Sequence, residues 1–452
     1  MHVKNFDELV DHGNKGLRKE LLRAVEVALE AVDPYRLTKN IVSIENGKLR
    51  VRHLQFDLNH VGRVFVVGAG KATYPIAKAL EEILDGRIAD SLIIVREDET
   101  RTLSRIRVVR AGHPIPNQAG YAAAQEIVKM ASNRDKDDLF FAAFTGGCSA
   151  LMPCPTEGVS LEDKREVTRL LLGSGATIRE INAVRKHLSR TKGGGLAKII
   201  APATVVNLTV SDVIGDPLDC ITDPTVVDPS TFADAIDALK KYDLLDKVAP
   251  SVRNRLAKGT PELETLKDYG RLRVHNFIIA NNVMAAETVR NYFEARGFNS
   301  EILTTSLEGE SREVGLVIAS IASETVQYNR PLKKPAAYVF AGETLVKLEE
   351  SMLREEMGGP SQELAVAVAL HLPQNSRVAA IFLDTDGSDG PTAYAGALVD
   401  SETAKRAELL HVDLYESLKR HEVSLVLRKL SDAVITGPTG KNVMDLAIVA
   451  IQ

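Results

Sequence analysis

Strand-length runs of apolar residues alternate with helix-length segments along most of this 452-residue chain. Between the runs, apolar residues recur three and four positions apart, the spacing that places them on one face of a helix. Strands that alternate with helices predict βαβ units on a mainly parallel sheet, and therefore an α/β fold. In the first part of the chain the runs lie at residues 64–67, 91–95, 139–143 and 203–208.

Two helices in this part can be placed more closely. Residues 16–32 predict a leading helix. Asn117 predicts the start of another helix, because its side chain can cap the first turn. Tyr121, Ala124 and Val128 would then share one face of that helix.

A second α/β pattern follows a segment rich in proline and aspartate at residues 216–267. Because a chain of this length exceeds what one hydrophobic core supports, we expect two domains. We place them at residues 1–268 and 269–452. The second pattern predicts strands at residues 277–280, 301–304, 336–340 and 378–383, and helices at 281–296 and 309–328.

The composition is that of an ordinary globular protein, with 44% hydrophobic and 26% charged residues. No apolar run reaches membrane-spanning length, and the charged N-terminus lacks the apolar core of a signal peptide. We therefore expect a cytoplasmic protein with no membrane partner. The three cysteines are an odd number, which favours free thiols. A net charge of -5 without a basic stripe argues against a nucleic-acid partner.

The first candidate site is the turn Gly68-Ala69-Gly70-Lys71, where a strand leads into a helix. The glycines let backbone amides approach an anion at the positive end of the helix, and Lys71 adds a full charge. A dinucleotide fingerprint would need a third glycine where Thr73 stands, and a Walker A loop would need a longer spacing. The turn therefore predicts a phosphate or carboxylate contact, with a plain strand-to-helix turn as the alternative.

A second glycine pair, Gly146-Gly147, follows the strand-like run at 139–143 and precedes Ser149. Backbone amides and one hydroxyl in such a loop can cradle a phosphoryl group at the carboxyl edge of a parallel sheet. Downstream, Arg185 and Lys192 belong to a basic run of which we expect one or two side chains to reach a ligand.

Asp212 and Asp216 follow the run at 203–208 and lie near a glycine. Carboxylates at the mouth of a sheet can bind Mg²⁺ through water or activate a hydroxyl. The alternative for Asp212 is a turn cap.

Four polar loops follow the strands of the second domain, and each combines glycine with acidic, amide or hydroxyl groups. Taken singly, each could be an ordinary turn. Together they predict one face of a binding site. Their candidate residues are Glu343, Gln362, Glu363, Asp386, Asp389, Lys441 and Asn442.

With these motifs in place, the sequence resembles the glycerate 2-kinase family with a MOFRL C-terminal domain, over nearly the whole chain. Eight blocks in the same order carry the resemblance. They are Gly68-Ala-Gly-Lys71, Gly112-His-Pro-Ile-Pro116, Thr145-Gly-Gly147, Ile181-Asn-Ala-Val-Arg-Lys-His-Leu-Ser189, Ser211-Asp-Val-Ile-Gly-Asp216, Gln362-Glu-Leu-Ala365, Thr385-Asp-Gly-Ser-Asp-Gly-Pro-Thr392 and Thr436-Gly-Pro-Thr-Gly440.

The resemblance implies phosphorylation of D-glycerate at its 2-hydroxyl, dependent on ATP and Mg²⁺. It also implies a Rossmann-like N-terminal domain with a parallel sheet, a smaller C-terminal α/β domain, and a site in the cleft between them. The catalytic lysine would be Lys71, and we assign Asp212 to hydroxyl activation. Phosphate or substrate contacts are expected from Gly68, Gly70, Gly146, Gly147, Ser149, Arg185, Lys192, Glu343, Gln362, Glu363, Lys441 and Asn442. Metal contacts are expected from Asp212, Asp216, Asp386 and Asp389.

One departure from the family pattern bears on the substrate. Pro360 stands where the family usually has an arginine, so a charge and an amide donor are missing. This loss makes a sugar-acid or nucleotide sensor without turnover one alternative to the kinase. The other alternative is an NAD(P)H-dependent hydroxypyruvate reductase, a label that the family has sometimes carried, in which Glu97 and Asp98 after the next strand would contact a ribose. The sequence leaves room for a homodimer.

Overall fold

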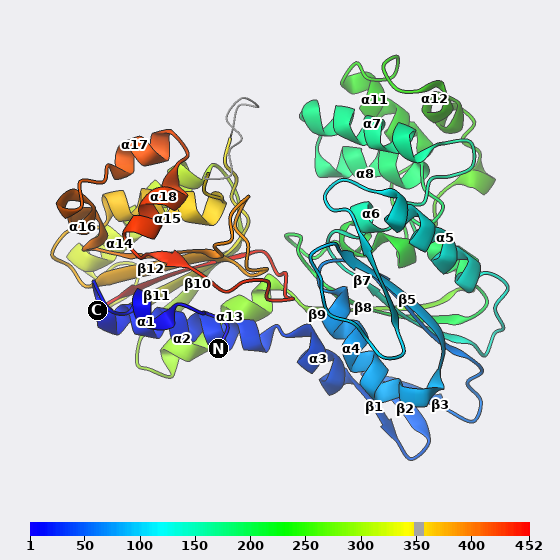
Figure 1. The fold of residues 1–452 in the computed structure, drawn as a ribbon, viewed down its shortest axis with the longest axis horizontal. Helices are drawn as coiled ribbons and strands as arrows, with labels where there is room; N and C mark the ends of the chain where they lie inside the picture. The colour runs from blue at the N-terminus through cyan, green and yellow to red at the C-terminus, as the bar shows by residue number, and fades with distance from the viewer. Residues whose placement is uncertain (348–356) are drawn as a thin grey trace. The chain divides into compact units, whose positions relative to one another are not determined.

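The computed structural model describes residues 1–347 and 357–452 (Figure 1). Contacts between Cα atoms divide these residues into two compact units, each of which combines helices with a sheet, as predicted. Unit 1 comprises Met1–Asp33, Asp212–Gly215 and Ala280–Gln452, and unit 2 comprises Pro34–Ser211 and Asp216–Ile279.

The sheet of unit 2 has six strands in the order β6-β5-β4-β7-β8-β9. Numbered along the chain this order is 3-2-1-4-5-6, the order of the Rossmann fold. The pairs β4–β5, β5–β6, β4–β7 and β7–β8 are parallel. The strands are β4 (Val64–Ala69), β5 (Ile88–Arg96), β6 (Arg107–Ala111), β7 (Leu139–Phe144), β8 (Thr204–Val210) and β9 (Arg273–Ala280).

The four strands predicted in the first part of the chain are thus confirmed. Strand β9 corrects one expectation, because the run at 277–280 completes this sheet and does not begin the second one. The sequence pattern could not show which sheet this strand joins, because a strand followed by a helix has the same pattern at the end of one sheet and at the start of the next.

The central strands of this sheet are buried along their whole length, because helices cover both of its faces. Helices α5 (Gln118–Ala131) and α9 (Gly195–Ile200) share a core with Phe65 and Val67, and α4 (Thr73–Leu84) packs on the other face. Asn117 caps α5 as predicted, with its side-chain oxygen 3.1 Å from the Gly120 amide nitrogen.

Two smaller layers complete unit 2. A three-stranded antiparallel sheet is formed by β1 (Val42–Glu45), β2 (Lys48–Val51) and β3 (Leu54–Asp57). A helical layer with its own apolar core is formed by α7 (Leu161–Gly173), α8 (Ile178–His187), α11 (Phe232–Lys241) and α12 (Pro250–Ala257). Capping boxes fix the first turns of both α7 and α8.

The sheet of unit 1 has the order β10-β11-β15-β12-β13-β14, in which β10 and β11 pair in parallel and the other neighbours pair antiparallel. Figure 1 shows α14 and α15 on one face and α2 and α13 on the other. The strands are β10 (Asn299–Leu307), β11 (Ala336–Gly342), β12 (Val378–Asp384), β13 (Gly396–Asp400), β14 (Ala433–Val434) and β15 (Asp445–Ile451). The main helices are α2 (Lys15–Ala31), α13 (Asn282–Glu294), α14 (Ser311–Tyr328) and α15 (Pro360–His371).

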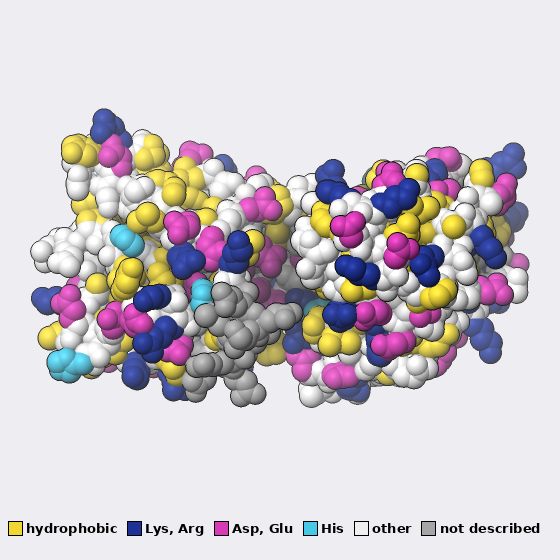
Figure 2. All heavy atoms as spheres, turned by 90° about the horizontal axis from the view of Figure 1, so that it is seen from above, with side chains coloured by type: hydrophobic (Ala, Val, Ile, Leu, Met, Phe, Trp, Pro, Cys, Tyr) yellow, Lys and Arg dark blue, Asp and Glu magenta, His cyan; other side chains and the backbone are white. Residues whose placement is uncertain are grey.

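The leading helix α2 was placed with the first domain by prediction, but in the structure it packs against α13 and the sheet of unit 1. Its buried face includes Leu17, Leu21 and Val25. On the face of the molecule drawn in Figure 2, acidic and basic side chains are interspersed over both units. Within residues 1–347 and 357–452, no helix combines the length and apolar character needed to cross a membrane.

A fully buried arginine fixes α2 to this sheet. Arg18 donates through Nη1 to Asp400 at 2.8 Å and through Nη2 to Asp432 at 2.5 Å. Burial would raise the pKa of the Asp432 carboxyl, but Arg18, His12 and Arg406 outweigh burial and hold that pKa below its usual value. Asp432 thus remains charged because Arg18 accompanies it.

Replacing Arg18 with methionine is expected to lower the free energy of unfolding by about 3–5 kcal/mol, because two buried carboxylates lose a shared counter-ion. Urea denaturation at pH 7 measures the effect. The control is Lys15→Met on the same helix, whose exposed ion pair with Asp11 is expected to contribute about 0–1 kcal/mol. Similar losses of stability in the two variants would contradict the role given to Arg18.

Candidate active site

The sheet of unit 2 changes direction at β4. From β4 the chain adds β5 and β6 on one side, and then crosses to add β7 and β8 on the other. The carboxyl ends of the two strands at such a switch point diverge into separate connections, and ligands of α/β proteins bind in the crevice between them. Here these connections are the turn at Gly70 and Lys71, and the turn at residues 145–147.

Hydrogen bonds join these two turns. The Lys71 amide donates to the Gly146 carbonyl at 2.9 Å, and the Ala72 amide donates to Oγ1 of Thr145 at 3.1 Å. Gly70 has φ of +146°, and a Cβ there would lie 2.0 Å from Oγ1 of Thr145. Only glycine therefore allows the first turn to approach the second this closely.

Gly147 lies beside two polar side chains. It has φ of +84°, and a Cβ at this position would lie 3.1 Å from the ring of His113 and 3.4 Å from Cγ of Lys71. Lys71 and His113 therefore both flank the Gly146-Gly147 turn. His113 follows β6, and sequence reasoning identified it only as part of a matching block.

Gly68 has a different role from the one predicted. It is buried within β4, and a Cβ there would lie 2.5 Å from the carbonyl oxygen of Ala143 on β7. Gly68 therefore serves the close packing of the strand, in place of the predicted phosphate contact.

A charged group is buried directly behind the second turn. Lys192 lies 2.6 Å from Oγ of Ser149 and pairs with Asp223 at 2.6 Å, with a side chain only 4% exposed. Burial lowers the pKa of Arg185, and the nearby Asp223 opposes this effect. The structure thus brings together Ser149, Arg185 and Lys192, three of the residues predicted to contact substrate.

Cys148 lies among these groups at the start of α6 (Cys148–Leu151). Burial raises the pKa of its thiol to about 12, although Lys192 acts in the opposite direction. The thiol is therefore protonated at neutral pH, which excludes a thiolate nucleophile in this state.

In unit 1, Asp389 anchors a helix. It is 2% exposed, and its carboxylate accepts hydrogen bonds from the amides of Ser361 at 3.1 Å and Gln362 at 2.8 Å, in the first turn of α15. Burial raises the pKa of Asp389 to about 7, while the bonds from Gln362 and Ser361 lower it. A structural role thus replaces the predicted metal contact for Asp389.

Gln362 and Glu363 also differ from prediction, because helix α15 is buried on all sides. The Gln362 side chain accepts a hydrogen bond from Ser424, and Glu363 bonds to Nδ1 of His421 at 2.6 Å. Both side chains are fully buried and pack within unit 1. Gln362 and Glu363 therefore pack α15 against its neighbours in unit 1, and these contacts replace the predicted substrate contacts.

Asp212 and Asn442 are brought together, since Nδ2 of Asn442 donates to Oδ2 of Asp212 at 3.1 Å. Lys441 forms an ion pair with Asp33 at 3.3 Å and is 4% exposed. Oδ1 of Asp386 accepts a hydrogen bond from the amide of Ser388 at 3.0 Å.

The remaining predicted residues divide between the two units. Asp216 belongs to unit 2 and has φ of +55°, whereas Glu343 is exposed in unit 1. In the described ranges, no three side chains of His, Cys, Asp or Glu are arranged to hold a metal ion. The predicted metal ligands Asp212, Asp216, Asp386 and Asp389 therefore do not form such a group.

Sequence reasoning missed one carboxylate pair. Asp384 and Asp445 are partners across the neighbouring strands β12 and β15. Burial raises the pKa of Asp445, and so do the nearby Asp384 and Asp389. The position of Asp384 in the sequence could have indicated it, because Asp384 immediately precedes the Thr385-Asp386 motif.

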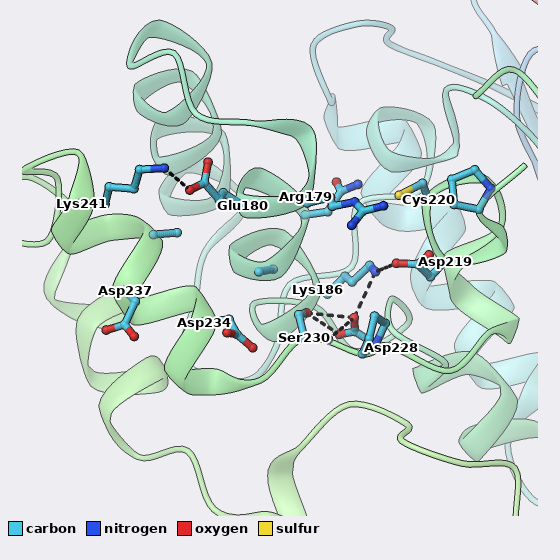
Figure 3. Close-up of a pocket in the computed structure, with 15 residues that line it drawn as sticks. Arg179, Glu180, Lys186, Asp219, Cys220, Asp228, Ser230, Asp234, Asp237 and Lys241 are labelled. Carbon is cyan, nitrogen blue, oxygen red and sulfur yellow. Dashed lines mark hydrogen bonds and ion pairs between the residues drawn. The ribbon is translucent and has the colours of Figure 1, made fainter. Parts of the chain in front are cut away.

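A cavity of about 630 Å³ lies elsewhere in unit 2, beside α8 and α11 (Figure 3). Lys186 points into it and pairs with Asp219 at 2.9 Å and Asp228 at 3.1 Å. Carboxylates outnumber cations in its wall, which makes it unsuited to a phosphate. Its charged groups are Arg179, Lys186 and Lys241 against Glu180, Asp219, Asp228, Asp234 and Asp237.

Two family matches cover most of the chain. The family described as Domain of unknown function (DUF4147) matches residues 20–257, and the MOFRL family matches residues 336–445.

Individual relatives match over nearly their whole length. Glycerate 2-kinase of Pyrococcus horikoshii is 40% identical, over 96% of this chain and 97% of the relative. The crystal structure of glycerate kinase from Thermotoga maritima, 36% identical, matches with a TM-score of 0.84 and covers 97% of this chain and 100% of that one. A relative from Agrobacterium vitis, provisionally named a hydroxypyruvate reductase, is 36% identical over 86% of this chain and 100% of its own length. From the two family matches and these full-length relatives, it follows that this chain belongs to the glycerate 2-kinase family.

Proposed function

We propose that this protein transfers the terminal phosphoryl group of ATP to the 2-hydroxyl of D-glycerate or a closely related sugar acid. The observation that carries the proposal is the position of Lys71 against the Gly146-Gly147 turn at the switch point of a Rossmann-like sheet. Membership in the glycerate 2-kinase family supports the same activity. A cytoplasmic location stays a prediction.

Phosphoryl transfer requires positioning and charge neutralisation more than covalent assistance. Lys71 precedes the first turn of α4, where unpaired amides and the helix dipole favour an anion. We assign the ammonium of Lys71 to the transferred phosphoryl group, and the Gly146-Gly147 turn to its oxygens. We assign a further hydrogen bond to His113, which also lies beside Gly147.

The acceptor hydroxyl must lose a proton during transfer, and we assign Asp212 to receive it. The hydrogen bond from Asn442 orients this carboxylate. A carboxylate has about four lone-pair sites, so it can accept hydrogen bonds from an amide and from a hydroxyl together.

Mg²⁺ also remains a proposal. In kinases this ion is commonly held by one or two carboxylates together with the phosphates of the nucleotide, so a cage of three protein ligands is not required. Of the predicted ligands, Asp386 retains a half-buried carboxylate in a glycine-containing loop and would suit such a contact. The bound ion would neutralise phosphate charge.

The reductase alternative depended on Glu97 and Asp98 to hold a ribose. In the structure Asp98 accepts a hydrogen bond from Nε of Arg96 at 3.0 Å, and Glu97 accepts one from Asn117 at 2.8 Å. Both acids thus already accept hydrogen bonds within unit 2, and Thr73 stands where a dinucleotide fingerprint needs its third glycine, which favours the kinase.

The proposal is tested by assaying the purified protein with ATP and D-glycerate, and separately with NADH and hydroxypyruvate. We expect ADP to form in the first assay and NADH to persist in the second. A screen of sugar acids with three to six carbons would reveal a related acceptor. Consumption of NADH would favour the reductase, and absence of ADP formation with every acid would favour the sensor.

Lys71→Ala is expected to reduce kcat by roughly 10²-fold or more, the scale for loss of a preorganised electrostatic group. The fold should persist, because alanine is tolerated before a helix. Lys78→Ala removes an exposed lysine of α4 and serves as the control, with kcat unchanged. Circular dichroism establishes folding, and near-normal turnover in folded Lys71→Ala would remove Lys71 from the mechanism.

Asp212→Asn is expected to lower kcat more than it changes KM for ATP, because the amide keeps the shape of the side chain but is a poor proton acceptor. Steady-state kinetics over a range of Mg²⁺ concentrations separates this role from metal binding. Wild-type rates with unchanged Mg²⁺ dependence would leave Asp212 as a structural residue.

A further inference from the structure

Lys164, on α7, is a buried lysine that the described residues leave without a hydrogen-bond partner. Its residue is 5% exposed, and Nζ has no acceptor in the described part of the chain. Burying an ammonium without a partner is costly, so such a group usually has a counter-ion in some state of the protein.

The charges around Lys164 increase the cost of burying its ammonium. Burial and the nearby cations Lys192 and Arg185 together lower the pKa of Lys164 to about 7, while Cys154 and Asp223 act in the opposite direction. With Lys164 protonated, three cations face one carboxylate and leave an excess of positive charge. Since Lys192 already pairs with Asp223, the excess resides on Lys164 and Arg185.

The position of this cation cluster (Lys164, Arg185 and Lys192) links it to the switch point. Lys192 contacts Ser149, two residues beyond Gly147. The charge of Arg185 acts on Cys148, the residue between them. An anion held here would therefore lie beside the turn assigned to the phosphoryl group.

We propose that Lys164 and Arg185 bind the carboxylate of the acceptor acid. This inference rests on the proposed function and names the groups that would select an acid over a neutral polyol. A guanidinium can hold a carboxylate through two parallel hydrogen bonds, and an ammonium adds a third donor. A carboxylate would neutralise one of the two excess positive charges, whereas a nucleotide triphosphate carries several negative charges.

Binding of a carboxylate favours the protonated form of Lys164. In the protein without ligand the pKa of Lys164 lies at about 7. The affinity for D-glycerate is therefore expected to fall as the pH rises from 6.5 to 8.5, because Lys164 loses its proton. In Lys164→Met this pH dependence is expected to be smaller.

The test is calorimetric titration of the full chain with D-glycerate in the absence of nucleotide. Lys164→Met is expected to bind D-glycerate roughly 10- to 100-fold more weakly, the scale of a hydrogen bond to a charged group. KM for ATP should be unchanged, and thermal stability should be equal or higher, because methionine removes an unpartnered buried charge. Lys164→Gln provides a second neutral variant if the methionine variant is poorly folded.

Lys186→Met is the matched control, since Lys186 is a buried lysine of the same unit whose charge is paired with Asp219 and Asp228. It should lose stability and keep its affinity for D-glycerate, the opposite of Lys164→Met.

Unchanged affinity for D-glycerate in a folded Lys164 variant would overturn the inference, as would wild-type protein that does not bind D-glycerate. An increase in KM for ATP alone would assign the cluster to a phosphate and also overturn it. If D-glycerate binds in a Lys164-dependent manner but ATP is never consumed, the carboxylate site stands and the proposed kinase activity fails.

Discussion

The candidate site depends on how closely two turns of the chain approach each other. Gly70 leaves no room for a Cβ against Thr145, and Gly147 leaves little room against His113 and Lys71. With these contacts in place, the Lys71 amide is bonded to the second turn, and its side chain lies along that turn. The parallel pairing of β4 and β7 supplies the frame, because it aligns the ends of both strands at one edge.

Buried charged side chains in this protein differ in whether the fold supplies a partner of opposite charge, and we use this difference to distinguish structural from functional groups. Arg18, Lys186 and Lys192 are each accompanied by carboxylates within bonding distance, so their charges are satisfied within the fold. Among residues 1–347 and 357–452, Lys164 is buried without such an acceptor. Because an unsatisfied buried ion destabilises a protein, we attribute the presence of Lys164 to the ligand proposed above.

Much of the fold could be predicted from sequence, because buried parallel strands are continuous apolar runs and the helices between them are amphipathic. Strands β4, β7 and β12 lie where the runs indicated. The pattern could not show which sheet a strand joins, and β9 was therefore placed in the wrong one. The central strand β15 was missed, although residues 445–451 are mostly apolar.

The site was less predictable than the fold. Gly70 and Lys71 could be found because a strand, two glycines and a helix are adjacent in sequence. Asp389 and Gln362 share the composition of a ligand-binding loop, yet they bond to each other inside unit 1, a distinction that depends on three-dimensional packing. Lys164 escaped notice because a lysine in a polar helix reads as exposed until tertiary packing covers it.

The most direct test of this account is a crystal structure of the protein soaked with a non-hydrolysable ATP analogue and D-glycerate. We expect the terminal phosphate beside Lys71 and the Gly146-Gly147 turn, with the glycerate carboxylate at Lys164 and Arg185. Phosphate density in the cavity beside Lys186, with the switch-point turns unoccupied, would contradict it.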